Sequence, residues 1–453
     1  MTRITNALRS FYNGYYYPLL VALLIYLGHS TNLEIIFLPI LITGVFVGCL
    51  LAKDIRFLIT PLFCTIFFVT ADHSPNVPNY SDYYTRPQIL LCLILCAALL
   101  VIGMIVFLWR NWRERNRFSL RSGLLPGILF FCIAMSLNGM GAKAYTPGNL
   151  GYGSTFLFAL LLIYLLFAAF FRFDDRSTDY LMYCMVIAGL LICAQLLTAF
   201  TGDIRFDEQG NVVKETVILG WGVWTTVGGM LCMLMPACFY FFATKKWGWM
   251  GLLAGCLEWL CILLSQSRGA LLFGSLILLL CVIASSFCGN FQKRNRYFAL
   301  GGVAFAVLGA LLLAGKLLPL VQNFLTDGFG DNGRFDLWKA GWYRFKEAPI
   351  LGSGFYNSYI NEEWNFQVMP YMYHNTVIQL LGATGVLGIL TYAYHRVQTV
   401  ALLLRKPTPY KIFAGIGVLG LLLFSMLDVM FFNIYPMFYY GLFLLFAERE
   451  ATA

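Results

Sequence analysis

The sequence has few charged residues for its length. Only 12% of its 453 residues are Asp, Glu, Lys or Arg, whereas soluble domains carry about 25%, and 60% are hydrophobic. One soluble core cannot bury this much apolar surface, so most of it must face lipid. The net charge of +9 does not require nucleic acid as a partner, because an excess of Lys and Arg on cytoplasmic loops gives the same sign.

The sequence also lacks the signatures of a secreted, metal-binding or repetitive protein. All thirteen cysteines lie in or at the edge of apolar segments, and no Cys-x-x-Cys or Cys/His cluster occurs. This argues against a disulfide-bonded ectodomain and against a metal site, and we expect no cofactor. The first apolar segment lacks a small-residue cleavage site, so we expect it to be retained as a span.

Long apolar runs, in contrast, are abundant. A membrane span needs roughly 20 apolar residues, and fourteen segments approach that length. The third, fifth, ninth and last are short, which leaves twelve spans as an alternative. The expected fold is therefore an all-α polytopic transmembrane bundle of 12–14 spans. The approximate cores are residues 15–28, 34–51, 57–71, 89–109, 124–137, 155–171, 180–200, 217–243, 249–264, 270–288, 297–318, 375–394, 412–431 and 434–447.

The basic residues predict the topology. With both termini in the cytoplasm, about two-thirds of the Lys and Arg residues fall on the cytoplasmic side, as the positive-inside rule requires. We expect a bundle over residues 1–318, one large extracytoplasmic loop over 319–374, and C-terminal helices over 375–453. Basic residues are rare in the outer segments, so a Lys or Arg kept there is a stronger candidate for a function.

Two arginines stand out at the predicted outer face. Arg268 lies between two apolar runs, where an arginine normally needs a counter-charge. Arg334 opens a segment that predicts an interfacial helix ending before Pro349, because aromatic residues follow it at helical spacing. The planar guanidinium group suits phosphate binding, whereas the alternative for each is a side chain that only anchors a helix at the interface. The aromatic residues are Trp338, Trp342 and Phe345.

The third candidate is His374, where the long loop re-enters the membrane. It is one of four histidines, and although a lone histidine is often structural, imidazole can accept a proton near neutral pH. Together the three residues suit a lipid-linked pyrophosphate donor. The arginines would neutralise the pyrophosphate without a metal ion, and the histidine would deprotonate an incoming hydroxyl.

Five motifs with these residues occur in order along the chain. Over roughly residues 220–390 they resemble the signature of the O-antigen ligase and O-antigen polymerase superfamily. The motifs are Ser267-Arg268-Gly269, Arg334 with Trp338, the segment 349–355, His374-Asn375, and the glycine-rich segment 382–388.

The resemblance implies a glycosyltransferase of the bacterial inner membrane with its active site on the outer face. Members of the family move glycans from undecaprenyl pyrophosphate to a lipid acceptor (ligases) or to another lipid-linked repeat unit (polymerases of O-antigen, capsule or exopolysaccharide). The implied reaction is inverting and metal-independent, with Arg268 and Arg334 on the pyrophosphate and His374 as general base. The implied partners are the donor, a lipid or glycan acceptor and membrane lipids. The implied substrate-binding residues are Arg268, Arg334, Gly352, Gly354, Asn375 and Trp338.

Weaker candidates and competing functions remain open. Arg205, on the outer segment 201–216, is a third candidate phosphate ligand or a solvated charge. Glu258 and Asp428, acids in apolar segments, are candidate counter-charges or satisfied polar groups. A glycolipid flippase would favour internal repeats, which we do not find. A cell-wall glycan polymerase would rely on an outer-loop acid, for which Asp327, Asp331 and Asp336 are available.

Overall fold

The computed structural model describes residues 2–70, 86–116, 123–142, 145–208, 212–312, 333–356 and 372–452. Within these ranges the regular elements are helices, accompanied by two isolated β-bridges, Phe206 with Val212 and Ile218 with Val223. The predicted all-α bundle is confirmed.

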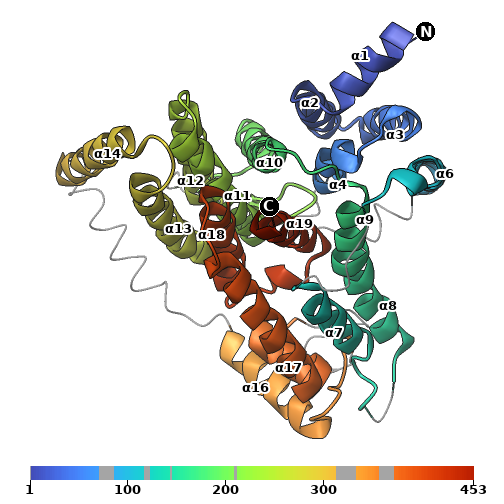
Figure 1. The fold of residues 1–453 in the computed structure, drawn as a ribbon. Helices are drawn as coiled ribbons and strands as arrows, with labels where there is room; N and C mark the ends of the chain where they lie inside the picture. Colours follow the sequence, from blue (N-terminus) through green and yellow to red (C-terminus); the bar gives the residue numbers. More distant parts are fainter. Residues whose placement is uncertain are drawn as a thin grey trace.

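Helices form at every one of the fourteen predicted spans. In lipid the backbone must satisfy its own hydrogen bonds, so long apolar runs fold as helices. Proline at the first turn, which costs no helical hydrogen bond, begins α6, α7, α8 and α18. In chain order the helices (Figure 1) are α1 (Thr2–Tyr12), α2 (Tyr16–Ser30), α3 (Glu34–Leu51), α4 (Ile59–Cys64), α6 (Pro87–Asn111), α7 (Leu125–Ser136), α8 (Pro147–Phe156), α9 (Ile163–Phe170), α10 (Ser177–Ala199), α11 (Trp224–Thr244), α12 (Trp249–Leu264), α13 (Arg268–Phe287), α14 (Gln292–Leu312), α16 (Arg334–Glu347), α17 (Thr376–Leu404), α18 (Pro409–Phe424) and α19 (Ile434–Thr452).

Seven of the described helices are long and apolar enough to cross a membrane, and five more apolar helices are shorter. The chain is therefore a multi-pass membrane protein, while the count of 12–14 spans stays a prediction. The seven segments are Glu34–Leu51, Pro87–Glu114, Pro147–Phe170, Ser177–Ala199, Trp224–Thr244, Arg268–Phe287 and Thr376–Leu404.

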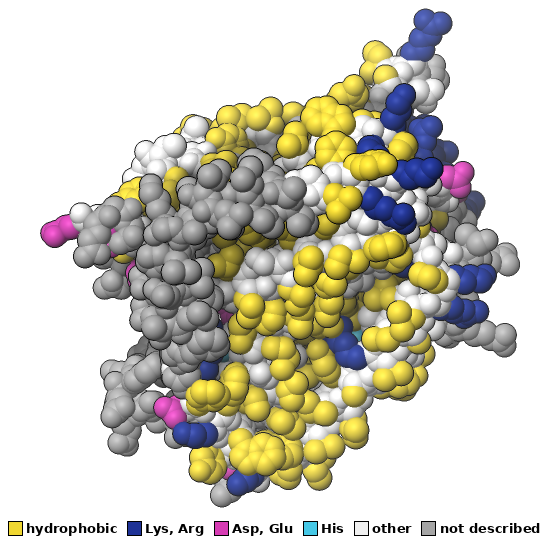
Figure 2. Space-filling model, turned by 90° about the vertical axis from the view of Figure 1, so that its left-hand side faces the viewer, with side chains coloured by type: hydrophobic (Ala, Val, Ile, Leu, Met, Phe, Trp, Pro, Cys, Tyr) yellow, Lys and Arg dark blue, Asp and Glu magenta, His cyan; other side chains and the backbone are white. Residues whose placement is uncertain are grey.

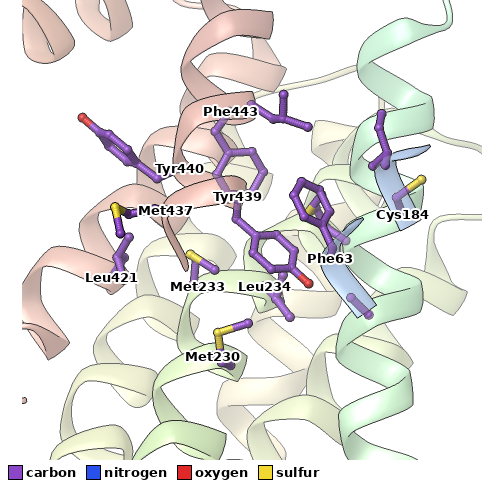
Figure 3. Close-up of a cluster of buried hydrophobic side chains, with 14 of the residues drawn as sticks. Phe63, Cys184, Met230, Met233, Leu234, Leu421, Met437, Tyr439, Tyr440 and Phe443 are labelled. Atoms are coloured by element: carbon purple, nitrogen blue, oxygen red, sulfur yellow. The ribbon is translucent and has the colours of Figure 1, made fainter. Parts of the chain in front are cut away.

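Helix α11 forms the centre of the bundle. Every residue from Val227 to Ala243 is buried, and the helix packs against α10, α12, α13 and α18. Figure 3 shows the adjoining core, where Tyr439 of α19 stacks on Phe63 of α4 with their ring centroids 4.1 Å apart. Methionines of α11, including Met230 and Met233, line the same cluster, so helices far apart in sequence meet on α11.

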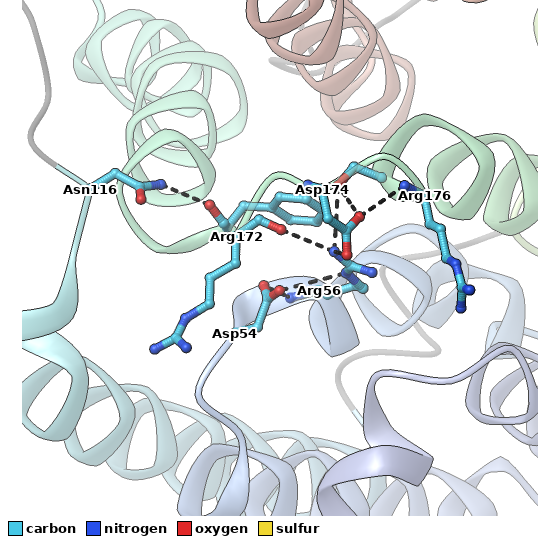
Figure 4. A network of polar contacts seen from close by, with 8 residues as sticks. Asp54, Arg56, Asn116, Arg172, Asp174 and Arg176 are labelled. Carbon is cyan, nitrogen blue, oxygen red and sulfur yellow. Dashed lines mark hydrogen bonds and ion pairs between the residues drawn. The ribbon is translucent and has the colours of Figure 1, made fainter. Parts of the chain in front are cut away.

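One end of the bundle holds a buried polar network (Figure 4). Arg56 donates hydrogen bonds to the Arg172 carbonyl and to Asp174, both at 3.0 Å, and its guanidinium lies 3.6 Å from Asp54. The network ties the α3–α4 connection to the α9–α10 connection. Three arginines, Arg56, Arg172 and Arg176, therefore lie together at this end (Figure 4). In Figure 2 a broad apolar face separates a basic edge below α1 from a smaller charged group at the opposite end.

Helices α16 and α17 lie side by side at that opposite end (Figure 1). Gly341 allows their close approach, because a Cβ there would lie 2.4 Å from Ile378 Cγ2. Further along, the Val386 N–H donates to the Pro349 carbonyl at 2.8 Å, so the two helices run in the same direction. The N-terminus of α16 therefore lies at the same end as the N-terminus of α17.

Helix α17 is broken at Gly385. This residue has φ +62° and ψ −156°, outside the helical region. The carbonyls of Pro349 and Ile350 lie against it, where a Cβ would be 2.6 Å from each oxygen. The segment after α16 packs against this break, which separates a short N-terminal part of α17 from the longer remainder.

Candidate functional site

The site is organised where α17 begins and α18 ends. Asn375 caps α17, and its side-chain oxygen accepts the N–H groups of Val377 and Ile378 at 2.9 and 3.2 Å. Its amide donates to the Met426 carbonyl, and the Thr376 N–H donates to the Ser425 carbonyl at 3.0 Å. The end of α18 therefore supplies acceptors to the start of α17 and fixes the residue just before it, His374.

His374 adopts an uncommon backbone conformation. Its φ of +51° lies in the left-handed region, which few non-glycine residues occupy, although His, Asn and Asp do so more often than others. Its side chain is 42% exposed, and its Nδ1 lies 3.2 Å from Asp428 Oδ1. The contact orients the ring and leaves Nε2 as the nitrogen for other partners.

Asp428 does not lie inside a span, in contrast to the expected core at 412–431. Helix α18 ends at Phe424, because Ser425 begins a bend whose hydroxyl accepts the Phe431 N–H at 2.9 Å. Asp428 sits in this bend with its side chain 18% exposed. Burial alone would raise its pKa, but the contact with His374, the Val429 N–H and the Thr225 hydroxyl together hold the pKa of Asp428 below its ordinary value.

Arg268 is presented by the turn between α12 and α13. The Ser267 hydroxyl accepts the Ala270 N–H at 3.3 Å, so Ser267 caps α13 and Arg268 becomes its first residue, with an exposed side chain. Helix α11 packs closely against this turn, since a Cβ on Gly228 would lie 2.4 Å from the Ala270 Cβ. A serine cap thus places an arginine on the surface at the start of a helix.

The same turn adjoins the bend that holds Asp428. Gly269 faces Leu427, and a Cβ on this glycine would lie 3.1 Å from the leucine Cδ1. Leu427 is the chain neighbour of Asp428, which contacts His374. The turn carrying Arg268 and the loop carrying His374 therefore meet on the bend after α18.

Arg334 is the first residue of α16, as the sequence predicts. Gly333 precedes it with φ +75°, and the helix ends at Glu347, before Pro349. The parallel packing of α16 on α17 brings Arg334 to the end where His374 lies. The residues Asp331 and Asp327 lie outside the described ranges, whereas Asp336 is exposed and pairs with Lys339 at 3.1 Å.

Lys214 is a basic residue of this region that sequence reasoning missed. It lies in the segment before α11, which the sequence predicts to be on the outer side, with its amine 5.0 Å from the centroid of the Trp224 ring. Burial and the charge of Arg268 lower its pKa, Glu215 opposes them, and Arg334 lowers it further. The charges of both predicted arginines therefore contribute to the lowered pKa of Lys214. The scarcity of basic residues in the outer segments was the signal that could have identified it.

The remaining predicted residues occupy defined places. Trp338 is half-buried on α16, with its ring 5.3 Å from Phe335. Arg205 is exposed on the other arm of the Lys214 segment, where its carbonyl accepts the Val213 N–H at 2.9 Å. Asn375 uses its side chain as a helix cap. A substrate-binding role for each of them stays a prediction.

Gly352 and Gly354 pack against other helices. Both have positive φ, +70° and +90°. A Cβ on Gly352 would lie 2.2 Å from the Ala383 carbonyl carbon, and one on Gly354 would lie 2.4 Å from Asn149 Nδ2. The turn is buried against the break in α17 and against α8, which gives both glycines a packing role. Approach of this backbone to a donor stays a prediction.

Glu258 lies away from the site, deep in the bundle. It is fully buried on α12 and accepts from the Cys238 Sγ at 3.2 Å. The structure gives no contact between Glu258 and Arg268, so the expected counter-charge role has no support from the described residues.

The comparison with protein families finds one match, described as O-Antigen ligase, over residues 252–393. The matched segment covers roughly a third of the chain, from α12 into α17, and it contains Arg268, Arg334 and His374. The comparison with curated proteins finds no match. The matched domain confirms the resemblance seen in the sequence: residues 252–393 are similar to the O-antigen ligase family.

Proposed function

We propose that the protein is an O-antigen ligase-type glycosyltransferase that uses a glycan linked to undecaprenyl pyrophosphate. The observation that carries this proposal is the His374–Asp428 contact beside the turn that presents Arg268. A histidine held by a carboxylate and exposed at a membrane-protein surface suits the removal of a proton from an acceptor hydroxyl. The O-antigen ligase match supports a lipid-linked glycan donor and an acceptor in general terms.

In the proposed reaction His374 is the general base. Asp428 accepts a hydrogen bond from the Nδ1–H of His374, which leaves Nε2 unprotonated and able to take the proton of the acceptor hydroxyl. The acceptor oxygen then attacks the anomeric carbon, and the bond from that carbon to the pyrophosphate oxygen breaks. Direct displacement from the opposite face inverts the anomeric configuration.

Arg268 and Arg334 would bind the pyrophosphate and stabilise its negative charge as it leaves. Guanidinium groups form paired, charge-assisted hydrogen bonds with phosphate oxygens, and such bonds strengthen as charge develops in the transition state. Both arginines lie at the end of the bundle where α17 begins, and the charge of each contributes to the lowered pKa of Lys214, after the larger effect of burial. We propose that this end faces the outside of the bacterial inner membrane and that both termini are cytoplasmic.

A defined donor tests the proposal. Purified protein in proteoliposomes would receive an undecaprenyl-pyrophosphate glycan together with a lipid A-core acceptor. Transfer to the separate acceptor identifies a ligase, whereas elongated lipid-linked products identify a polymerase of the same superfamily. If the glycan stays on its donor, or if the protein only moves the donor across the bilayer, the proposed function is wrong.

A further inference from the structure

The first turn of α11 supports three parts of the candidate site. The Lys214 amine lies 5.0 Å from the centroid of the Trp224 ring, and the next residue, Thr225, is among the groups that lower the pKa of Asp428. Four residues after Trp224, Gly228 packs closely against the connection between α12 and α13, because a Cβ on Gly228 would lie 2.9 Å from Ser265 Oγ. Segments that carry a lysine, a carboxylate and an arginine therefore converge on a single helical turn.

The convergence places positive charges near one another. Lys214 contacts Trp224, and one turn further along α11 Gly228 packs against Ala270, two residues after Arg268. In agreement with this placement, burial and the charges of Arg268 and Arg334 lower the pKa of Lys214, whereas Glu215 raises it. Like charges in proximity are costly when partly desolvated, and an anion between them relieves the repulsion. Lys214 is half-buried, so its charge is less screened than that of a fully exposed lysine.

The place of Lys214 also suits a ligand. The aromatic ring of Trp224 holds its side chain through a cation–π contact, while the ammonium group keeps three hydrogen-bond donors. An ammonium is a compact point charge that can move between phosphate oxygens, whereas a guanidinium is a planar fork. A lysine beside two arginines therefore complements them and does not duplicate them.

We propose that Lys214 is a further binding residue of the site and contacts the pyrophosphate of the lipid-linked donor together with Arg268 and Arg334. The inference rests on the proposed function, because it assumes that the ligand is a lipid-linked diphosphate. It adds a residue that lies outside the segment 252–393 that matches the O-antigen ligase family. A purely structural role, in which Lys214 only covers Trp224, is the alternative that an experiment must separate.

Two substitutions separate charge from packing. Lys214→Met keeps an unbranched stem over Trp224 and removes the charge, and Lys214→Arg keeps the charge. Lys339→Gln is the matched control, because Lys339 is an exposed cation on α16 that pairs with Asp336. Thermal unfolding of each variant in nanodiscs would confirm that the bundle is intact.

The measurement is the affinity of these variants for undecaprenyl diphosphate and for undecaprenyl monophosphate. We expect Lys214→Met to weaken diphosphate binding roughly 10- to 100-fold, the value of a hydrogen bond to a charged group, and to affect the monophosphate less. Lys339→Gln should bind the diphosphate nearly as the wild type does, and Lys214→Arg, which keeps the charge, should lose less affinity than Lys214→Met. Wild-type affinity in Lys214→Met, or an equal loss in Lys339→Gln, would overturn the role of Lys214. Failure of the wild type to prefer the diphosphate would instead reject the proposed donor.

Discussion

His374 Nδ1 lies 3.2 Å from Asp428 Oδ1, although 54 residues separate them in the chain. The contact joins the loop before α17 to the bend after α18. The Val429 N–H also donates to Asp428 Oδ1, at 2.8 Å, and so helps to hold the carboxylate in the bend beside His374. The imidazole is thereby held with Nε2 directed away from Asp428.

Asp428→Asn should slow transfer without abolishing donor binding. Asparagine keeps the shape of the side chain but loses the negative charge that stabilises the protonated imidazole. We expect a loss of about 1.5–3 kcal/mol, which is roughly 10- to 100-fold in kcat. The rate of glycan transfer at saturating donor, measured beside KM, checks this expectation.

Asp336→Asn is the matched control for that substitution. Asp336 is an exposed acid on α16 that pairs with Lys339, and we expect its variant to retain the wild-type rate. The opposite pattern, with Asp336→Asn inactive and Asp428→Asn normal, would favour the mechanism of a cell-wall glycan polymerase with an outer-loop acid.

The Asp428 carboxylate should stay ionised under mildly acidic conditions. Its pKa in the folded protein is held below the ordinary value, so its contribution to stability is present above the unfolded pKa of about 3.9. That contribution is lost only as the pH falls through the lower folded pKa. The difference in unfolding temperature between the wild type and Asp428→Asn should therefore stay constant from pH 7 to pH 4.5. A difference that disappears within this range would contradict the lowered pKa.

Gly352→Ala should destabilise the fold. The substitution forces a Cβ to within 2.2 Å of the Ala383 carbonyl carbon at a residue with φ +70°. The positive φ alone costs an L-residue about 1–2 kcal/mol, and the clash adds to it. We expect a lower unfolding temperature than for Gly202→Ala, where no atom lies within 4 Å of the new Cβ. An unchanged unfolding temperature with weakened donor binding would instead favour approach of this backbone to the donor.

Transfer should persist in a metal chelator. Arginine side chains can neutralise a pyrophosphate and stabilise it as a leaving group, which is the role that a divalent cation has in other transferases. We expect the same rate with and without EDTA. A loss that added Mg²⁺ restores would show that the arginines do not suffice.

Hydropathy predicted the helices well, but not where apolar segments break. A helix lies within each of the fourteen predicted spans, and α16 carries Arg334 in its first turn and ends before Pro349, as expected. The bend at 425–433 was missed, because it continues an apolar run without proline or glycine. Asp428 was therefore assigned to a span, and its pairing with His374 could not be predicted.

The site residues contributed by distant segments were the hardest to predict. Arg268, Arg334 and His374 were identified because their motifs resemble a family signature. Lys214 belongs to no such motif, and its place depends on the packing of an outer segment over Trp224. The spacing of apolar residues predicts which face of a helix is buried, but it does not predict which loops pack over the end of that helix.

Single-turnover transfer by His374→Asn, measured beside its donor binding, tests most directly whether His374 removes the acceptor proton. Asparagine suits this test because it tolerates the positive φ of position 374 but cannot act as a base. We expect donor binding to remain and the rate of transfer to fall by roughly 10²- to 10⁴-fold, the usual contribution of general base catalysis. Transfer at the wild-type rate would contradict the role of His374.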